Sequence, residues 1–292
     1  MEPQISTIAV LGAGTMGRGI AHVSALAGIA THLYDPFPEA LQKAESTIHR
    51  NLAKGVELKK VDPETAERAR AGLHLHDDLA GAVREAGLII EAVPEDMGLK
   101  IRTFEEVVRS CPENALLASN TSALSITEMA AATGRPDRFA GMHFFNPVHV
   151  MKLIELVRGL ETSRETLDAL RRVGERMGKE IVTVNEAPGF VTSRINALIG
   201  NEAFRMLQEG VASAEDIDKA LKLGLNHPMG PFEMVDLVGL DVRLSILEFL
   251  HRTLGEAYRP NQILVQHVRA GRLGRKVGRG VYTYDENGER IR

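Results

Sequence analysis

Short apolar runs alternate with amphipathic stretches over the first two thirds of the chain. The run at residues 5–11 is rich in β-branched residues and ends at a glycine, so it predicts a buried strand. Similar runs lie at residues 30–34, 87–93, 115–119, 138–144, 152–157 and 180–184. Helical patterns separate several of them, at residues 16–27, 98–109, 125–132 and 164–177. This alternation predicts an α/β domain with a doubly wound, mainly parallel sheet.

Two other stretches have helical patterns without intervening strands. The charged stretch from residue 39 to about residue 70 is too long for a simple crossover, so we expect it to project from the sheet as a helical arm. Beyond Asn185-Glu186-Ala187-Pro188-Gly189, helical patterns cover residues 189–209, 214–223, 231–253 and 260–270, and Asn287-Gly288 predicts a tight turn. We therefore expect an α/β domain over residues 1–187 and an all-α domain over residues 188–292.

Composition narrows the class of protein. Of 292 residues, 25% are charged and 44% hydrophobic, which is typical of a globular protein. The net charge of −4 gives no reason to expect a nucleic-acid partner. A single cysteine, Cys111, excludes an internal disulfide and a clustered thiol metal site. The N-terminus lacks a signal-peptide pattern, and no apolar run approaches the roughly 20 residues that span a bilayer. We expect a cytoplasmic protein with no membrane partner and no metal.

A glycine-rich turn follows the first predicted strand. Gly12, Gly14 and Gly17 fit the pattern G-x-G-x-x-G between a strand and a helix, which is typical of a Rossmann-type dinucleotide site. Asp35 ends the second strand about 20 residues later, where a carboxylate accepts ribose hydroxyls and repels a 2′-phosphate. The alternative is a turn needed only for packing. We expect NAD as cofactor, held by this turn including Thr15 and Met16.

A second feature combines a histidine with a buried carboxylate. His143 ends an apolar strand, where catalytic groups gather in open α/β sheets. Glu155 lies inside the apolar run at residues 152–157, where an unpaired charge is costly. A pair between them would orient the imidazole and stabilise its cation, as general-base catalysis requires. The alternatives are a purely structural pair, or a glutamate exposed on an edge strand.

Other polar groups have two interpretations each. The run Ser119-Asn120-Thr121-Ser122 follows a strand and could bind a substrate oxygen or the nicotinamide, or could form a helix-capping turn. Glu95 and Lys100 could reach the cofactor ribose or form a solvated surface pair. A basic cluster on the helical arm could bind the phosphates of a large anionic substrate or be a solvated helix face; its members are Lys54, Lys59 and Lys60.

Together these motifs resemble the L-3-hydroxyacyl-CoA dehydrogenases, most closely the short bacterial 3-hydroxybutyryl-CoA dehydrogenases. The resemblance covers essentially the whole length. Its markers are GAGTMGRGIA near the start, EAVPED at 91–96, LASNTSALSI at 117–126, GMHFFNPVHVMKLIELV at 141–157, APGFVTSRI at 187–195, HPMGPFEMVDLVGLD at 227–241 and GRKVGRGVYTY at 274–284.

The resemblance implies reversible NAD-dependent oxidation of an L-3-hydroxyacyl-CoA, as in fatty-acid β-oxidation. It makes His143 the base, Glu155 its acidic partner and Ser122 the contact to the reacting oxygen. The positions that it places around the cofactor are Glu95, Lys100, Asn120 and Asn146. It places Lys54 and Lys59 near the CoA moiety. It also implies a homodimer formed through the helical domain.

The chain departs from the family pattern at two positions. Ser193 stands where the motif P-G-F-x-x-N has asparagine, and because serine is shorter its contact with the substrate oxygen is kept through water, weakened or shifted. Val277 stands where threonine or serine is common, and we expect a small effect there. Three other functions are compatible with these motifs. One is a dehydrogenase of the L-gulonate type on the same scaffold. The second is a dinucleotide-binding protein without turnover, as in related lens crystallins. The third is a detached module of a multifunctional β-oxidation enzyme.

Overall fold

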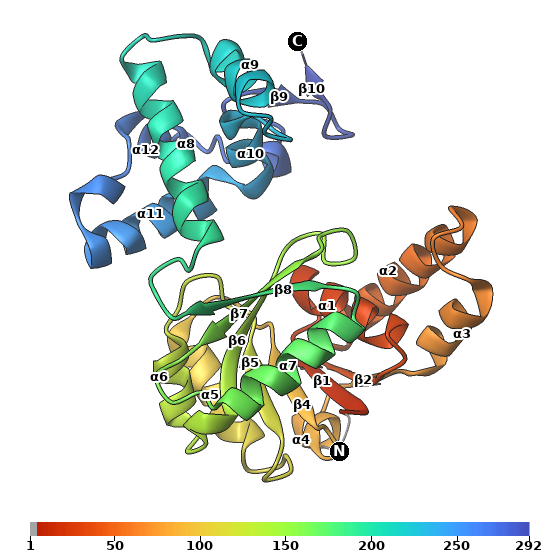
Figure 1. The fold of residues 1–292 in the computed structure, drawn as a ribbon. Helices are drawn as coiled ribbons and strands as arrows, with labels where there is room; N and C mark the ends of the chain where they lie inside the picture. The colour runs from red at the N-terminus through yellow and green to blue at the C-terminus, as the bar shows by residue number, and fades with distance from the viewer. Residues whose placement is uncertain (1–4, 292) are drawn as a thin grey trace. The chain divides into compact units, whose positions relative to one another are not determined.

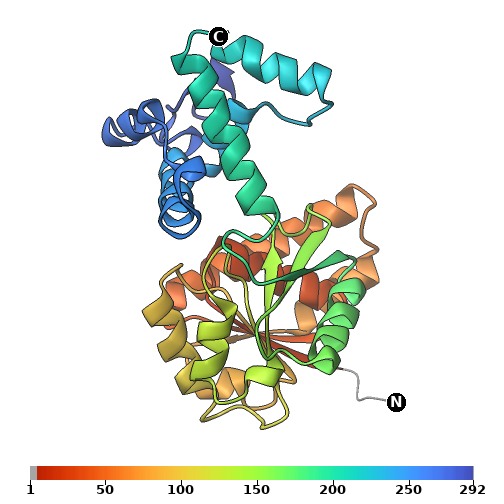
Figure 2. The same cartoon turned by 60° about the vertical axis from the view of Figure 1, so that its left-hand side comes forward.

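The computed structural model describes residues 5–291 of the chain. Within this range the chain forms two compact units, the first ending at Glu186 and the second beginning at Ala187. Figures 1 and 2 show a sheet covered by helices in the first unit and a group of packed helices in the second.

The sheet of the first unit places the candidate site. Among the described residues, eight strands form it in the order β3-β2-β1-β4-β5-β6-β7-β8. All neighbours are parallel except β6 and β7, which are antiparallel. The first six strands have the order of dinucleotide-binding folds, so the predicted doubly wound, mainly parallel sheet is confirmed. The strands are β1 Thr7–Leu11, β2 Ala30–Tyr34, β3 Leu73–His76, β4 Leu88–Glu91, β5 Leu116–Ser119, β6 Phe139–Phe144, β7 Leu153–Arg158 and β8 Glu180–Asn185.

The helices of the first unit cover the sheet, and two of them form the predicted arm. The arm consists of α2 and α3, which lie side by side and pack against α1 (Figure 1). The elements are α1 Thr15–Leu26, α2 Pro38–Glu57, α3 Pro63–Ala71, α4 Leu79–Val83, α5 Met97–Val107, α6 Ile126–Ala132, the 3-10 turn Pro136–Arg138 and α7 Arg164–Arg176. The prediction of a helical arm is confirmed.

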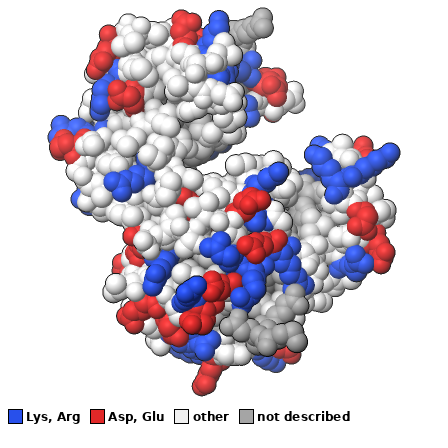
Figure 3. Space-filling view, in the orientation of Figure 1, with Lys and Arg blue, Asp and Glu red and all other residues white. Residues whose placement is uncertain are grey.

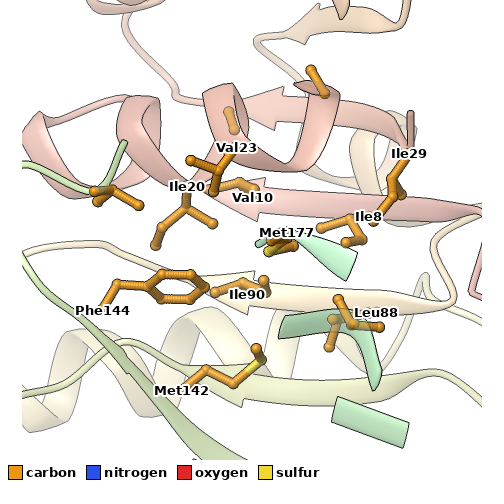
Figure 4. Packing of buried hydrophobic residues seen from close by; sticks show 14 of the residues in the cluster. Ile8, Val10, Ile20, Val23, Ile29, Leu88, Ile90, Met142, Phe144 and Met177 are labelled. Atoms are coloured by element: carbon orange, nitrogen blue, oxygen red, sulfur yellow. The ribbon is translucent and has the colours of Figure 1, made fainter. Parts of the chain in front are cut away.

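The core shows why these residues form these elements. Ile20 and Val23 of α1 lie over alternate residues of the central strands, including Val10 and Ile90 (Figure 4). The intervening strand residues face the other side, where Phe104 of α5 meets Phe139 of β6 with ring centroids 4.8 Å apart. Strands that are apolar on both faces are typical of a parallel sheet buried between helices.

The prediction missed one strand and one α-helix of the first unit. Strand β3 has the sequence LHLH and helix α4 has five residues. The strand contains no β-branched residue and lies at the sheet edge, where its side chains are at least partly exposed. Its pattern is therefore too weak and too short to recognise.

The second unit is helical, as predicted, with one correction. Its helices are α8 Thr192–Gln208, α9 Ala214–Gly224, α10 Pro231–Val238, α11 Leu240–Leu254 and α12 Gln262–Arg269. A single helix over residues 231–253 was wrong, because Gly239 has φ +106° and separates α10 from α11. The predicted turn at Asn287-Gly288 joins two short strands, β9 Thr283–Tyr284 and β10 Arg290–Ile291. In residues 5–291 no helix is both long and apolar enough to cross a membrane.

Candidate active site

The glycine-rich turn lies between β1 and α1 and has the geometry of a dinucleotide cradle. Gly12 turns the chain with φ +99°, and its N–H donates to the carbonyl oxygen of Tyr34 at 2.7 Å. A Cβ atom on Gly17 would lie 1.7 Å from the carbonyl oxygen of Gly12, so only glycine lets the helix approach the strand this closely.

Gly14 has a different reason to be glycine. It is the N-cap residue of α1 and makes no side-chain capping bond, and a Cβ atom added to it would meet nothing within 4 Å. Packing therefore does not require glycine here, whereas a phosphate group approaching the helix N-terminus does. Thr15 and Met16 begin the helix at this point. The open space beside the helix N-terminus fits a pyrophosphate.

Asp35 completes the cradle from the end of β2. Its Oδ2 accepts a hydrogen bond from the N–H of Ala13 at 2.8 Å, and its Oδ1 accepts one from Phe37 at 3.1 Å. An ionised carboxylate has about four acceptor positions, so capacity for ribose hydroxyls remains. The residues of the turn and of β2 therefore fit NAD.

A buried ionic network lies beside the cradle, at the ends of β4 and β5. Lys100 is only 1% exposed, and its Nζ lies 2.6 Å from Glu91 Oε1 and 3.2 Å from Glu95 Oε2. Ser119 donates to the second oxygen of Glu91 at 2.5 Å. The interpretation of Glu95 and Lys100 as a solvated surface pair is therefore wrong for the lysine.

Glu95 also fixes the polar run that follows β5. Its Oε1 accepts hydrogen bonds from the Thr121 hydroxyl at 2.5 Å and from the Ser122 N–H at 2.9 Å. Asn120 accepts a bond from the N–H of Phe144 at 2.8 Å, which joins the ends of β5 and β6. The N-cap of α6 is Ser125, so the run itself does not cap this helix.

His143 and Glu155 form the predicted pair. They are directly opposed in the antiparallel β6–β7 ladder, and His143 Nδ1 lies 2.8 Å from Glu155 Oε2. Their residues are 5% and 1% exposed. Strand β7 lies between β6 and β8, so the alternative of a glutamate exposed on an edge strand is wrong. The carboxylate of Glu155 therefore faces Nδ1 of the imidazole from the neighbouring strand.

Two family models match nearly the whole chain. The model of the 3-hydroxyacyl-CoA dehydrogenase NAD binding domain matches residues 7–187, and that of the C-terminal domain matches residues 189–284. The chain belongs to the 3-hydroxyacyl-CoA dehydrogenase family. It is an NAD-dependent oxidoreductase.

Individual relatives of this dehydrogenase agree with the family models. A probable 3-hydroxybutyryl-CoA dehydrogenase of Bacillus subtilis is 46% identical over 97% of this chain and 99% of its own. A human mitochondrial hydroxyacyl-coenzyme A dehydrogenase is 38% identical over 96% of this chain and 91% of its own. The crystal structure of (S)-3-hydroxybutyryl-CoA dehydrogenase from Ralstonia eutropha has a TM-score of 0.93 and 42% identity, covering 97% of this chain and all of that one.

Four further predicted residues take no part in the buried ionic network of Glu91, Glu95 and Lys100. Asn146 follows β6 and lines a small hollow together with Thr15, so the start of α1 and the β6–β7 connection meet there. Lys54 lies in the last turn of α2, and Lys59 follows that helix. Both lysines are exposed, and Figure 3 shows basic side chains gathered at the end of the arm. Ser193 lies in the first turn of α8, in the second unit.

The burial of Glu91 and its contact with Ser119 were not predicted. Glu91 ends the apolar strand LIIE and is fully buried, and Ser119 ends β5 beside it. The signal that identified Glu155, a charged residue within an apolar strand, is also present at Glu91. Its partner Lys100 lies nine residues further on, within a helix, and so its burial was not evident from the pattern.

Proposed function

We propose that this dehydrogenase oxidises an L-3-hydroxyacyl-CoA reversibly to the 3-ketoacyl-CoA, with short-chain 3-hydroxybutyryl-CoA as substrate. The observation that carries the proposal is the buried His143–Glu155 pair. It lies on the strand whose end is joined through Asn120 to the parallel strands that carry the cofactor cradle. The names of full-length relatives at 42–46% identity support the substrate class.

The pair supplies the proton chemistry. Because Nδ1 of His143 faces Glu155, Nε2 is the ring atom that accepts the hydroxyl proton. Glu155 holds the ring in this tautomer and stabilises the imidazolium that forms. Ser122 holds the reacting oxygen, and the contact of Ser193 with the same oxygen stays a prediction from the family motif. NAD, when bound, supplies the acceptor for the hydride that leaves C3 of the substrate.

The cofactor and the substrate are held by different parts of the α/β domain. The pyrophosphate binds at the N-terminus of α1 and the turn before it, that is, at Gly12, Gly14, Thr15, Met16 and Gly17. Asp35 holds the ribose. The nicotinamide end is held by Glu95, Asn120 and Asn146, and Lys100 acts on it by holding Glu95 in place. Lys54 and Lys59 on the arm bind the CoA phosphates; their exposure at its end supports this role.

The substrate class is tested by following NADH loss with acetoacetyl-CoA, with NADPH and free acetoacetate as parallel controls. Rapid loss with the CoA ester and NADH alone is the expected result. Free CoA should compete with the ester. Oxidation of L-gulonate that is insensitive to free CoA would instead support the sugar-acid function. Saturable NADH binding without oxidation of any substrate would support the non-catalytic one.

We also propose a homodimer formed through the helical unit. Several large apolar side chains of this unit are exposed in the single chain, among them Ile195, Leu223, Leu225 and Leu237. Exposed apolar surface of this kind is typical of a subunit interface. Light scattering should give twice the chain mass of 31.9 kDa, and a monomer at all concentrations would contradict the proposal. The cytoplasmic location and the role in β-oxidation stay predictions.

A further inference from the structure

The connection between β6 and β7 is held by a buried lysine. This segment, residues 145–152, is named here the β6–β7 loop; it follows His143 and carries Asn146. Lys179 precedes β8 and is 8% exposed. Its ammonium donates to the carbonyl oxygen of Val148, and to that of Met151 at 2.8 Å. One side chain therefore fixes two points of the loop.

The burial of this charge is costly. Both acceptors are neutral carbonyls, and desolvation lowers the pKa of Lys179. A buried ammonium is tolerated only where its hydrogen bonds are satisfied, and an apolar residue of similar length would be cheaper to bury. The two bonds from Lys179 define the path of the loop, which an apolar side chain could not do.

The opposite side of the loop packs on the cofactor helix α1. A Cβ atom on Gly19 would lie 2.7 Å from Cγ2 of Val148, so backbone and loop are in close contact there. The ring of His149 stacks on that of His22, with centroids 5.5 Å apart and planes 15° apart. The β6–β7 loop is thus held between Lys179 and the helix whose N-terminus forms the pyrophosphate cradle.

We propose that Lys179 is a positioning residue for the cofactor. By fixing the β6–β7 loop against α1, it sets the spacing between the pyrophosphate cradle, Asn146 and the base His143. The proposal rests on the proposed function, in which these three groups contact one bound NAD and its substrate. Loss of the two bonds from Lys179 displaces the nicotinamide end of the site. Lys54 and Lys59 are not among the arm residues that border the loop, so they keep their places.

The test compares Lys179→Met with a matched control, Arg176→Met. Arg176 also donates to backbone carbonyls, those of Ile5, Ala27 and Gly28 at 2.8–3.1 Å, but none of these residues belongs to the β6–β7 loop. We expect Lys179→Met to raise KM for NADH roughly tenfold and to lower kcat, since a misplacement of about 1 Å can cost ~100-fold in rate. KM for acetoacetyl-CoA should stay within about twofold of wild type. Arg176→Met should melt at a lower temperature with unchanged kinetics.

A second variant displaces the loop from the opposite side. Gly19→Ala places a methyl group against Val148, while alanine favours the helix by about 1 kcal/mol over glycine. It should therefore raise KM for NADH as Lys179→Met does, without loss of the helix. If Lys179→Met does not fold, Gly19→Ala alone tests whether the position of the loop sets KM for NADH. Wild-type values of KM for NADH in Gly19→Ala, or equal effects of Lys179→Met and Arg176→Met, would overturn the proposal.

Failure of the proposed function is separable from failure of this inference. If the wild-type enzyme does not turn over acetoacetyl-CoA, the substrate assignment fails. Fluorescence titration with NADH of the wild type and the three variants still measures how the bonds from Lys179 to the loop affect cofactor affinity. Weaker binding in Lys179→Met and Gly19→Ala alone supports the positioning role, and equal binding in all four proteins contradicts it.

Discussion

Lys100 lies between two carboxylates that differ sharply in exposure. The side chain of Glu91 is fully buried and that of Glu95 is 44% exposed. Water stabilises an exposed charge, whereas a buried charge depends on its partner. The two glutamates therefore hold the same lysine with different consequences for stability.

Replacing each glutamate should reveal this difference. Glu91→Gln leaves the buried ammonium short of charge compensation, so we expect the free energy of unfolding to fall by about 3 kcal/mol. For Glu95→Gln we expect a loss below about 1 kcal/mol, because its carboxylate is partly solvated. Urea denaturation measures both. Equal losses in the two variants would show that burial does not set the strength of these pairs.

His22 should make the stability of the fold depend on pH. Burial, followed by the charges of His149 and Lys179, lowers the pKa of His22 from its ordinary 6.5 to about 4. The folded state resists protonation, so this stability is complete above pH 6.5 and is lost as the pH falls towards 4. The shift corresponds to roughly 3 kcal/mol. Urea denaturation between pH 7 and 4, compared with His22→Gln, measures it. An unchanged pH dependence in the variant would contradict the assignment.

At the scale of single residues, a role could be predicted where an ionisable side chain stands at the end of an apolar strand or inside one. His143 and Glu155 are separated by 12 residues, but each ends or interrupts an apolar strand, so their pairing could be expected. Glu91 was missed because its partner Lys100 lies in a helix with charged neighbours. Sequence periodicity gives no measure of how deeply a long side chain is buried.

At the scale of elements, the turn between β1 and α1 contains one glycine that packing requires and another that we assign to cofactor binding. Gly17 faces the carbonyl of Gly12, whereas Gly14 faces open space. Gly14 has φ −63° and ψ −169°, which alanine also adopts. The two glycines should therefore respond differently to the same substitution.

Gly14→Ala should fold normally and bind NADH at least about tenfold more weakly, because its methyl group occupies space near the pyrophosphate. Gly17→Ala should lose more than about 3 kcal/mol of stability, because its methyl group would overlap the backbone. Thermal melting and fluorescence titration with NADH measure the two effects. A destabilised Gly14→Ala that retains full NADH affinity would contradict the assigned roles.

Most elements could be predicted because apolar strands and amphipathic helices differ in period. The exceptions have physical causes. Strand β3 is short and partly exposed, so its side chains give little apolar signal. The apolar pattern continues across Gly239, so α10 and α11 were predicted as one helix; the positive φ that separates them is not encoded in hydrophobic spacing.

At the scale of the whole molecule, chain connectivity brings distant motifs together. The glycine turn, the polar run after β5 and His143 are more than a hundred residues apart at the extremes, yet parallel strands carry them to one edge of the sheet. The fold class followed from the alternation of strands and helices. The family followed only from the whole set of motifs, since each alone fits several functions. Ser193, in the helical unit, was identified through the resemblance alone, and its role stays a prediction.

The central claim is that His143 is the base of an NAD-dependent hydroxyacyl-CoA dehydrogenase. The most direct measurement is NADH consumption with acetoacetyl-CoA by the wild-type protein and by His143→Ala, with NADH affinity measured by fluorescence in both. We expect rapid consumption by the wild type, a loss of at least ~100-fold in the variant and equal NADH affinity in both proteins. Turnover by His143→Ala close to the wild-type rate would contradict the account.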